Sequence, residues 1–520
     1  MLKRPVLAML AMVLAAALTS ACGQGGTSES GKDGVFTYAV GDEPETFNPA
    51  LQDGHTDPVT ELVFRGLTGH DANNKVVPAL AESWQVADDG RSYTFKLREG
   101  VTWHDGKPFT SDDVEFTIET VRDAGADAPL SRNFTMVKEV ATPDAHTVRL
   151  ELDEPFTPML GALSMGMLPK HVLDGKEITD AEFGRHPIGT GPFEITTYEH
   201  GQYAELAGFG EYYEGAPGLK KIVVKYVPDD SARLIQLNSG EVDGAHVRPK
   251  QAEQVKGHRL EVYPTADYRA ISFNMKKPVF ADKRVRTAMN HAIDRKAIVD
   301  SVVMGYGTAA KGPLDTSEYA AAEGFTFDAA KVASLMQDAG YARNGDGLWA
   351  KDGETVSFEL TTFAEDSLRV AILNVAATQL KKQGFDVKPN PRSSDWVRKH
   401  WGDLDAAVVG WGTPYDPDSS AYGVFHTDEA LANGGSNLGT YSNEEADKAL
   451  DKGRSTLDPA GRKTAYTDFQ NALQDDPPFA WIAYLKTINA VPENLTGPQQ
   501  RTLGHHGYGF FWNAQTWRYA

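Results

Sequence analysis

The stretch 79–119, ALAESWQVADDGRSYTFKLREGVTWHDGKPFTSDDVEFTIE, predicts a strand, a turn and a helix in succession. Tyr93, Phe95 and Leu97 alternate with polar residues, as in a strand that buries one face. The residues that follow are typical of a tight turn, and TSDDVEF at 110–116 is typical of an N-cap with an acidic first turn. These patterns describe a fold and contain no catalytic group.

Strands and helices interleave on both sides of this stretch. TVRLEL at 147–152 alternates again, whereas KIVVKYV at 221–227 is more uniformly apolar, as a strand buried on both faces would be. The segments 282–299 and 328–341 carry apolar residues at helical spacing, and Gly340 supplies a C-terminal stop for the second. This interleaving predicts the α/β or α+β class.

The chain is too long for a single hydrophobic core. Single cores stop growing at about 250–300 residues, so a chain of 520 residues predicts two or three domains. Hydrophobic residues make up 41% and charged residues 24%, which is typical of globular, soluble proteins. The net charge of −21 makes the surface unsuited to nucleic acid or anionic lipid.

The N-terminus has the features of an export signal. Two basic residues precede an apolar stretch that ends at Leu18, and LTSAC at 18–22 offers small residues for cleavage. LTSAC resembles a bacterial lipobox, in which the cysteine is acylated, and Cys22 is the single cysteine of the protein. The sequence therefore predicts a signal peptide at 1–21 and a flexible, lipid-anchored tether at 22–33. A plain cleaved signal with an incidental cysteine is the alternative.

The sequence contains no familiar catalytic or cofactor motif. It lacks a nucleophile elbow, an HExxH or CxxC motif, a phosphate-binding loop and a dinucleotide fingerprint. Acidic pairs such as Asp112–Asp113 are more typical of helix starts than of glycosidase sites. His505 and His506 would face opposite ways on an extended strand, so they predict no metal site. We expect no enzyme activity, no cofactor and no bound metal, with a secreted hydrolase as the alternative.

Several segments resemble, in order, the extracellular solute-binding proteins that serve peptide and nickel ABC importers. They are the stretch 79–119, IGTGPF at 188–193, SFNMKKPVFADKRVRTAMNHAIDR at 272–295, DAAKVASLMQDAGY at 328–341 and YSNEEADKAL at 441–450. The resemblance covers nearly the whole mature chain. It implies a receptor that captures a small solute outside the membrane and delivers it to an importer.

The resemblance also implies a two-lobed, type II periplasmic-binding-protein-like fold with an extra domain on the first lobe. Lobe I would comprise 34–50, 186–267 and 481–520, the extra domain 51–185, and lobe II 268–480. Two chain crossings, near 266–270 and 478–482, would form the hinge of a ligand-sized cleft between the lobes.

The aromatic stretch GWGTPYDPDSSAYGVF at 410–425 resembles a segment that lies in this cleft in peptide-binding members. Those members typically carry Trp-x-x-Asp-Tyr-x-Asp-Pro, whose first aspartate holds the α-amino group of the peptide. Pro414 stands at that position here. GTPYDP is similar to the loop of nickel- and metallophore-binding members, in which a histidine often follows, but Asp418 stands there.

The resemblance gives eight candidate ligand-binding residues. They are Trp411, Tyr415, Asp416 and Asp418 in the aromatic loop, Asp53, His55 and Thr56 in the loop after the first strand, and Tyr268 at the hinge crossing. The two rings of the loop would stack on ligand, and Asp416 would supply negative charge. The alternatives are a packing role for the aromatic loop, a turn cap for Asp416, a role only in a turn for Asp53, His55 and Thr56, and ordinary hinge packing for Tyr268.

Peptide is the expected ligand, because peptide binding dominates the resembling family. A nickel or metallophore complex, or an oligosaccharide, is the alternative within the same fold, and a sensor that imports nothing is a further one. The expected partners are an ABC permease and ATPase complex and, through the lipid anchor, the membrane. We expect a monomer that does not bind nucleic acid.

Overall fold

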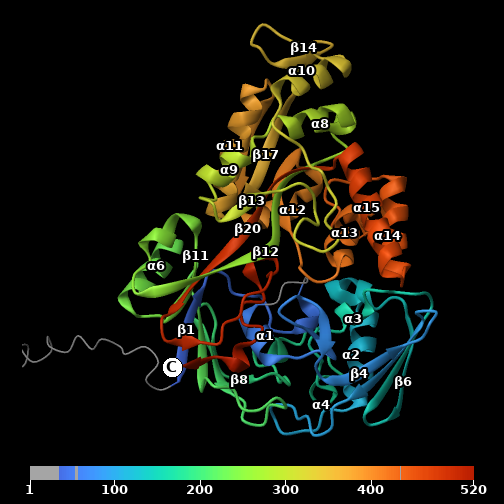
Figure 1. Ribbon diagram of the computed structural model, residues 1–520, viewed down its shortest axis with the longest axis vertical. Helices are drawn as coiled ribbons and strands as arrows, with labels where there is room; N and C mark the ends of the chain where they lie inside the picture. Colours follow the sequence, from blue (N-terminus) through green and yellow to red (C-terminus); the bar gives the residue numbers. More distant parts are fainter. Residues whose placement is uncertain (1–33, 53–56, 434) are drawn as a thin grey trace, which may run out of the picture.

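The computed structural model describes residues 34–520 apart from 53–56 and 434 (Figure 1). The predicted signal peptide and the whole predicted tether, Cys22 included, lie outside these residues, as do Asp53, His55 and Thr56. None of the described helices is both long and apolar enough to cross a membrane.

A large mixed sheet runs through the molecule (Figure 1). Its strands follow the order β18-β17-β19-β12-β20-β11-β1-β10-β9-β8, and β13 pairs with β20. The strands are β1 (Val35–Val40), β8 (Phe193–Glu199), β9 (Tyr203–Gly208), β10 (Lys221–Tyr226), β11 (Gly244–Val247), β12 (His258–Phe273), β13 (Gly307–Ala309), β17 (Ser357–Phe363), β18 (Asp386–Arg392), β19 (Ala406–Trp411) and β20 (Phe479–Pro492).

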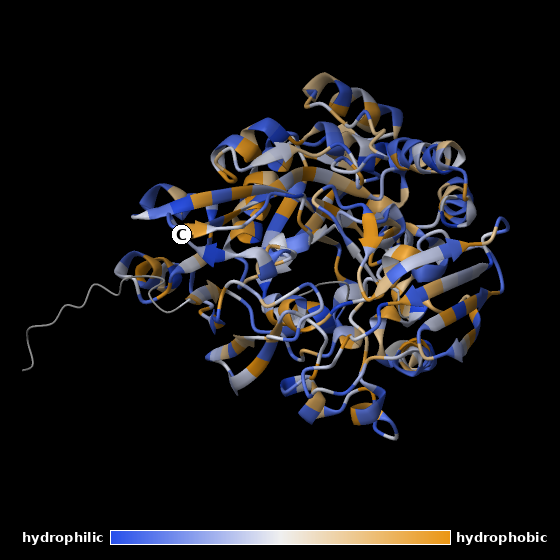
Figure 2. Ribbon diagram, turned by 60° about the horizontal axis from the view of Figure 1, so that its bottom comes forward, coloured by the Kyte–Doolittle hydropathy of each residue, from blue (hydrophilic) through white to orange (hydrophobic). Residues whose placement is uncertain are grey.

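The long strands β12 and β20 cross the middle of this sheet and join its two ends (Figure 1). They pair antiparallel, with a register shift between Pro264 and Tyr268. β20 is buried at every position except Lys486, and Figure 2 shows hydrophobic runs along the central strands. Both predicted hinge crossings fall on these two strands; the hinge motion itself stays a prediction.

A second, antiparallel sheet contains the strand of the stretch 79–119. Its order is β4 (Ala81–Val86), β5 (Ser92–Leu97), β7 (Thr147–Leu152) and β6 (Val137–Asp144). The inward side chains of β5 are buried, as their alternation predicts. α2 (Ser111–Asp123) begins at TSDDVEF, where the Thr110 amide donates to Asp113 Oδ2 at 3.0 Å.

Helices cover the large sheet and fill the space beside it (Figure 1). The remaining helices and short strands are α1 (Pro58–Val63), β2 (Thr68–His70), β3 (Val76–Pro78), α3 (Met159–Ala162), α4 (Lys170–Leu173), α5 (Ala181–Arg185), α6 (Asp230–Ser239), α7 (Pro278–Ala281), α8 (Lys283–His291), α9 (Arg295–Ser301), α10 (Ala329–Asp338), β14 (Ala342–Arg343), β15 (Trp349–Lys351), β16 (Glu354–Thr355), α11 (Ser367–Lys382), α12 (Ser394–Lys399), α13 (Pro417–Phe425), α14 (Glu444–Ser455), α15 (Pro459–Asp475), β21 (Leu495–Thr496) and β22 (Arg518–Tyr519).

The apolar core forms separate clusters at the two ends of the large sheet. One cluster joins β1 and β8 to β10 with the four-stranded sheet and α2. Two others lie among α8, α10, α11 and β17, and among α13, α14 and α15. The exact boundaries of the lobes and of the extra domain stay a prediction.

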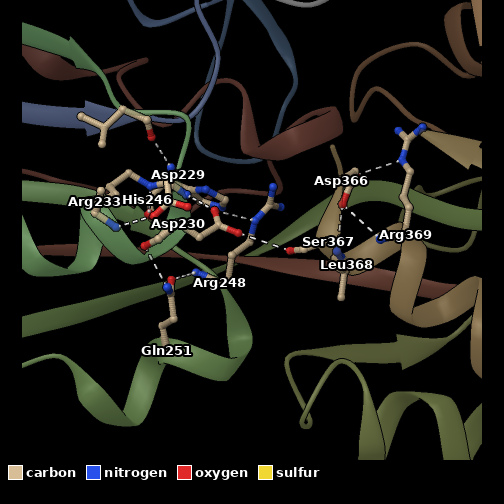
Figure 3. Close-up of polar contacts among 12 residues, drawn as sticks. Asp229, Asp230, Arg233, His246, Arg248, Gln251, Asp366, Ser367, Leu368 and Arg369 are labelled. Carbon is tan, nitrogen blue, oxygen red and sulfur yellow. Dashed lines mark hydrogen bonds and ion pairs between the residues drawn. The ribbon is translucent and has the colours of Figure 1, made fainter. Parts of the chain in front are cut away.

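Polar contacts also connect the two ends of the sheet beside β12, between α6 and the start of α11 (Figure 3). The Ser367 hydroxyl donates to Asp230 Oδ2 at 3.3 Å. Arg248 Nε donates to Asp230 Oδ1, also at 3.3 Å. In Figure 1, α6 lies on one side of β12 and β20, and α3, α13 and α14 lie on the other.

Candidate ligand-binding site

A cavity of about 520 Å³ lies where the aromatic loop meets α1, β2, α3 and the C-terminal segment. This volume is within the range of about 300–1,000 Å³ that holds small-molecule ligands. The residues discussed below that line it are Glu61, Arg65, His70, Tyr212, Trp411, Gly412, Tyr415, Asp416, Asp418, Tyr422, Arg454, Arg501 and Trp512.

The end of β19 and the start of α13 position the aromatic loop. Trp411 is the last residue of β19 and pairs with Tyr268 of β12. Gly412 has φ of +139°, and a Cβ there would lie 1.8 Å from the Ala266 carbonyl oxygen, so a glycine is required for the chain to leave the sheet. Asp416 then caps α13, its Oδ1 accepting from the Asp418 amide at 2.9 Å.

The rings of the loop contact both the core and the cavity. Trp411 stacks on Phe479 with ring centroids 5.7 Å apart. Tyr415 stacks on His70 of β2 at 3.9 Å, with an angle of 19° between the ring planes. Both rings are held by packing, so each can offer a wall of fixed position to a ligand at low entropic cost.

Each carboxylate at the start of α13 has its own arginine. Asp418 is buried, and its two oxygens accept from Arg454 Nε at 3.1 Å and Nη2 at 2.9 Å. Burial raises the pKa of Asp418, and Arg454 opposes that shift. Asp416 Oδ1 accepts from Arg462 Nη2 at 2.7 Å, whereas no described residue donates a hydrogen bond to its Oδ2. Asp416 is therefore the member of the pair with an oxygen to spare.

The other predicted residues have different surroundings. Tyr268 is fully buried, packs against Tyr484 at 5.8 Å and Trp411 at 6.5 Å, and does not line the cavity. Asp53, His55 and Thr56 lie outside the described residues. The aromatic loop thus supplies all of the predicted residues that the described part of the chain brings to the cavity.

The wall beside Tyr415 is made by residues that the sequence did not single out. The Tyr415 hydroxyl accepts from Arg501 Nη2 at 3.3 Å, and Arg501 lies over Trp512 at 4.8 Å. Glu61 Oε1 is 3.6 Å from Arg501 Nη2, and burial raises the pKa of Glu61 to about 7. Burial and Arg501 lower the pKa of His70 to about 3, so its imidazole is neutral.

No local sequence signal could have found this wall. Glu61 and His70 come from the first hundred residues, whereas Arg501 and Trp512 come from the C-terminal segment. Only tertiary packing brings these segments to Tyr415.

Hydrogen bonds join the end of α14, which carries the cavity residue Arg454, to the segment after β7. The Thr157 amide donates to the Arg454 carbonyl oxygen at 2.8 Å, and the Thr157 hydroxyl donates to the Thr456 carbonyl oxygen at 3.1 Å. The Arg454 guanidinium also lies 5.2 Å from the Phe156 ring and 3.3 Å from the Tyr422 ring. Arg454 therefore links the aromatic loop to the predicted extra domain.

The adjacent histidines do not lie on an extended strand, so the opposite-facing arrangement expected for them is wrong. His506 has φ of +57°, and this left-handed turn brings the two rings to 4.0 Å. His505 Nδ1 is 2.5 Å from Asp267 Oδ1, and Arg369 Nη2 is 3.3 Å from His505 Nε2. In the described part of the chain, no three His, Cys, Asp or Glu side chains form a group that could hold a metal ion.

Comparisons with known proteins agree with this geometry. The family of bacterial extracellular solute-binding proteins, family 5 Middle, matches residues 75–432. Protein XP55 of Streptomyces lividans is 30% identical over 503 residues, covering 95% of this chain and 92% of that protein. The oligopeptide-binding protein AppA of Bacillus subtilis (strain 168) is 32% identical over 521 residues, covering 94% of each chain.

Solved structures show the same fold. NikZ from Campylobacter jejuni in complex with Ni(L-His) gives a TM-score of 0.88 at 33% identity, covering 94% of this chain and 99% of that one. AppA in complex with a nonapeptide gives 0.80 at 30% identity, with the same coverage. The predicted fold class is confirmed. The chain belongs to the bacterial extracellular solute-binding proteins of family 5, and it is the non-catalytic substrate-binding protein of an ABC importer.

Proposed function

We propose that the protein is a lipid-anchored receptor that captures short peptides in the cavity of about 520 Å³ and delivers them to an ABC permease. The observation that carries the proposal is a cavity of ligand size that is lined by Trp411, Tyr415 and Asp416. The likeness to AppA, an oligopeptide-binding protein, supports the same ligand class.

In this proposal the free Oδ2 of Asp416 accepts a hydrogen bond from the peptide's ammonium group. It takes the role of the aspartate that Pro414 replaces, because a charge-assisted bond in a closed cavity is stronger than one in water. Trp411 and Tyr415 stack on the peptide without selecting one side chain. Asp418 acts through Arg454, with which it is paired. Asp53, His55 and Thr56 are proposed as further contacts, and Tyr268 as support behind the cavity wall.

Titration calorimetry with trialanine and N-acetyl-trialanine tests this proposal. We expect the free amine to bind more tightly, and Asp416→Asn to weaken trialanine by about tenfold or more, the scale of one charge-assisted hydrogen bond. Asparagine is also a good N-cap, so this change keeps the start of α13. Pro414→Asp should increase the affinity for free amines. Equal binding of both peptides would contradict the amine contact, and binding of neither would contradict the peptide assignment.

A complex of a metal ion with an amino acid is the second candidate. Its specific support is His70, whose Nε2 is buried without a hydrogen-bond partner among the described residues and whose ring is neutral. A neutral imidazole nitrogen is a good ligand for Ni²⁺, and NikZ was solved with Ni(L-His). Titration of the protein with Ni²⁺ and L-histidine together, repeated with His70→Gln, would separate this candidate from the peptide.

The membrane anchor is proposed to be an acyl group on Cys22. Cys22→Ser should leave the fold unchanged and move the protein from the membrane fraction to the soluble fraction, since the described helices provide no span. Retention of the variant in washed membranes would rule out this anchor.

A further inference from the structure

The C-terminal end of α14 lies against the predicted extra domain, on the side of β12 and β20 opposite α6 (Figure 1). A helix leaves its last carbonyl groups without partners inside the helix. In α14, the Gly453 carbonyl oxygen accepts from Arg462 Nε at 2.8 Å. The Arg454 and Thr456 carbonyl oxygens instead accept from Thr157, through its amide at 2.8 Å and its hydroxyl at 3.1 Å. A residue of the predicted extra domain thus completes the end of a helix of predicted lobe II.

Side chains extend this contact. Leu457, which follows α14, packs against the turn between β4 and β5, where a Cβ added to Gly90 would lie 2.9 Å from both of its methyl carbons. The Arg454 guanidinium carbon lies 3.3 Å from the centre of the Tyr422 ring and 5.2 Å from that of the Phe156 ring. We call this group of residues the α14 clasp; it consists of Gly90, Phe156, Thr157, Arg454, Thr456 and Leu457. Of these, Arg454 lines the cavity and the others do not.

The α14 clasp joins two bodies that have separate apolar cores. Phe156 belongs to the cluster around the four-stranded sheet, whereas α14 contributes Ala446 and Leu450 to the cluster that it shares with α13 and α15. Leu457 belongs to neither cluster and is 39% exposed. When the two bodies separate, water can take the place of Thr157 at both carbonyl oxygens, so each hydrogen bond gives only a small net gain. A contact of this size can form and break, as a shared core could not.

We propose that the α14 clasp closes the cavity before a solute binds, with Thr157 as the positioning residue. Every contact of the clasp is made by protein groups, so the closed form is populated in the free protein and a ligand increases that population. The apparent affinity for a ligand rises with the fraction of the protein that is already closed. The clasp therefore acts equally on every solute, and this inference does not depend on which solute the cavity takes. Its link to the aromatic loop is Arg454, which pairs with Asp418 at the start of α13.

Distances between the two bodies in the free protein test this proposal. Spin labels are placed on the Cys22→Ser chain, which has no other cysteine, through Lys138→Cys on β6 and Lys463→Cys on α15. Both lysines are exposed and both elements lie on the side opposite α6 (Figure 1), so closure shortens the distance between the labels. Pulsed electron paramagnetic resonance should give a short and a long distance before any ligand is added. Thr157→Val keeps the shape of the side chain and removes its donor, so the ratio of the short to the long population should fall about 2- to 10-fold.

Leu457→Ala should lower the same ratio, and Thr496→Val is the matched control. The Thr496 hydroxyl also donates to a distant carbonyl oxygen, that of Arg518 at 2.9 Å, but both residues belong to predicted lobe I. Thr496→Val should therefore leave the two distance populations unchanged. In calorimetry, Thr157→Val should lower the affinities for trialanine and for Ni²⁺ with L-histidine by one common factor, because it changes the closed fraction and touches neither ligand.

The outcomes separate this inference from the proposed function. A free wild type that shows only the long distance would overturn the proposal, and so would a distribution that neither Thr157→Val nor Leu457→Ala changes. A loss of affinity that differs between the two solutes would also contradict it, since Thr157 would then select among ligands. If Thr157→Val does not fold, Leu457→Ala decides the matter, because Leu457 is partly exposed. The label distances need no ligand, so a protein that binds no peptide can still confirm the clasp, and a failed clasp leaves the receptor proposal standing.

Discussion

The cavity around Tyr415 and a group of charged residues beside β12 both join segments that are far apart in the chain, and they differ in the space they enclose. We call the second group the hinge cluster; it consists of Asp267, Arg269, Asp366, Arg369 and His505. The cavity measures about 520 Å³, whereas the hollow next to the hinge cluster measures about 30 Å³, room for roughly one water molecule.

The same residue types therefore serve different purposes in the two regions. In the hinge cluster, Asp267 lies between Arg269 and His505, and Arg369 lies between Asp366 and His505. These groups form ion pairs with one another, and the hollow of about 30 Å³ beside them is too small for a ligand.

Each region contains buried nitrogens without a hydrogen-bond partner among the described residues, Nε of Arg269 and of Arg369 in the hinge cluster and Nε of Arg501 and Nε2 of His70 in the cavity wall. The regions differ in the space beside these groups, about 30 Å³ in the first and about 520 Å³ in the second. We infer that the hinge cluster supports the crossing strands, whereas the cavity is the proposed site for the solute.

The largest expected effect is on stability, from a change in the hinge cluster. Asp267→Asn keeps the shape of the side chain but removes the charge between buried Arg269 and His505. Breaking a buried ion pair in this way costs about 3–5 kcal/mol. The free energy of unfolding, measured with urea, should fall by this amount.

The control for this prediction is Asp300→Asn, which removes an exposed partner of Lys296. It should leave the unfolding midpoint unchanged, because exposed ion pairs contribute little. If Asp267→Asn proved as mild as this control, the hinge cluster would not be a support, and the contrast with the cavity would fail.

Acid should weaken the cavity wall and the turn beside the hinge cluster, because burial keeps His70 of the wall and His506 of the turn neutral. The folded pKa of His70 is about 3, and that of His506 is also well below 6.5 because of burial. The unfolded chain then binds more protons below pH 6.5, so stability present above that pH is lost as the pH falls. The loss approaches about 1.4 kcal/mol per pH unit for each imidazole.

Urea unfolding of the wild type and of His70→Gln at pH 7.5 and 4.5 measures how much of the acid-induced loss of stability is due to His70. The variant should lose about 2–3 kcal/mol less over this range than the wild type. An identical loss in the two proteins would mean that His70 is as easily protonated when folded as when unfolded, and would contradict its burial in the wall.

Much of the fold could be predicted from local patterns, and part of the site could not. The alternation of Tyr93, Phe95 and Leu97 reports one buried face, and the residues at 110–116 carry their own helix cap. The aromatic loop, which the family resemblance placed in the cleft, lines the cavity; its contact with a ligand stays a prediction. However, the arginine that neutralises Asp416 comes from α15, and Arg501 and His70 meet Tyr415 only after folding. Pairing between distant side chains leaves no periodic signal in a single sequence.

Trp411→Ala tests whether the cavity, unlike the hinge cluster, contacts a ligand. The ring should lie against bound ligand, so its loss should weaken binding by about 1–3 kcal/mol, the scale of a buried aromatic contact. Titration calorimetry with the tightest ligand of the panel measures this. Trp396→Ala is the control, because Trp396 is 36% exposed, stacks on His400 and does not line the cavity. Equal affinities for the wild type and Trp411→Ala would show that the ring packs only against Phe479.

The smallest expected effect comes from Ser367→Ala, at the contact between α6 and α11 in Figure 3. Ser367 is exposed and makes one hydrogen bond with Asp230, at 3.3 Å, so its removal should cost about 0.5 kcal/mol of stability. Ligand affinity should not change, because Ser367 does not line the cavity and the contact lies beside the crossing strands. Calorimetry and urea unfolding of the same preparation measure both quantities. A several-fold change in affinity with unchanged stability would mean that this contact exists in only one of the open and closed forms. The α6–α11 contact would then control closure, and the separation between a ligand-binding region and a supporting region would have to be abandoned.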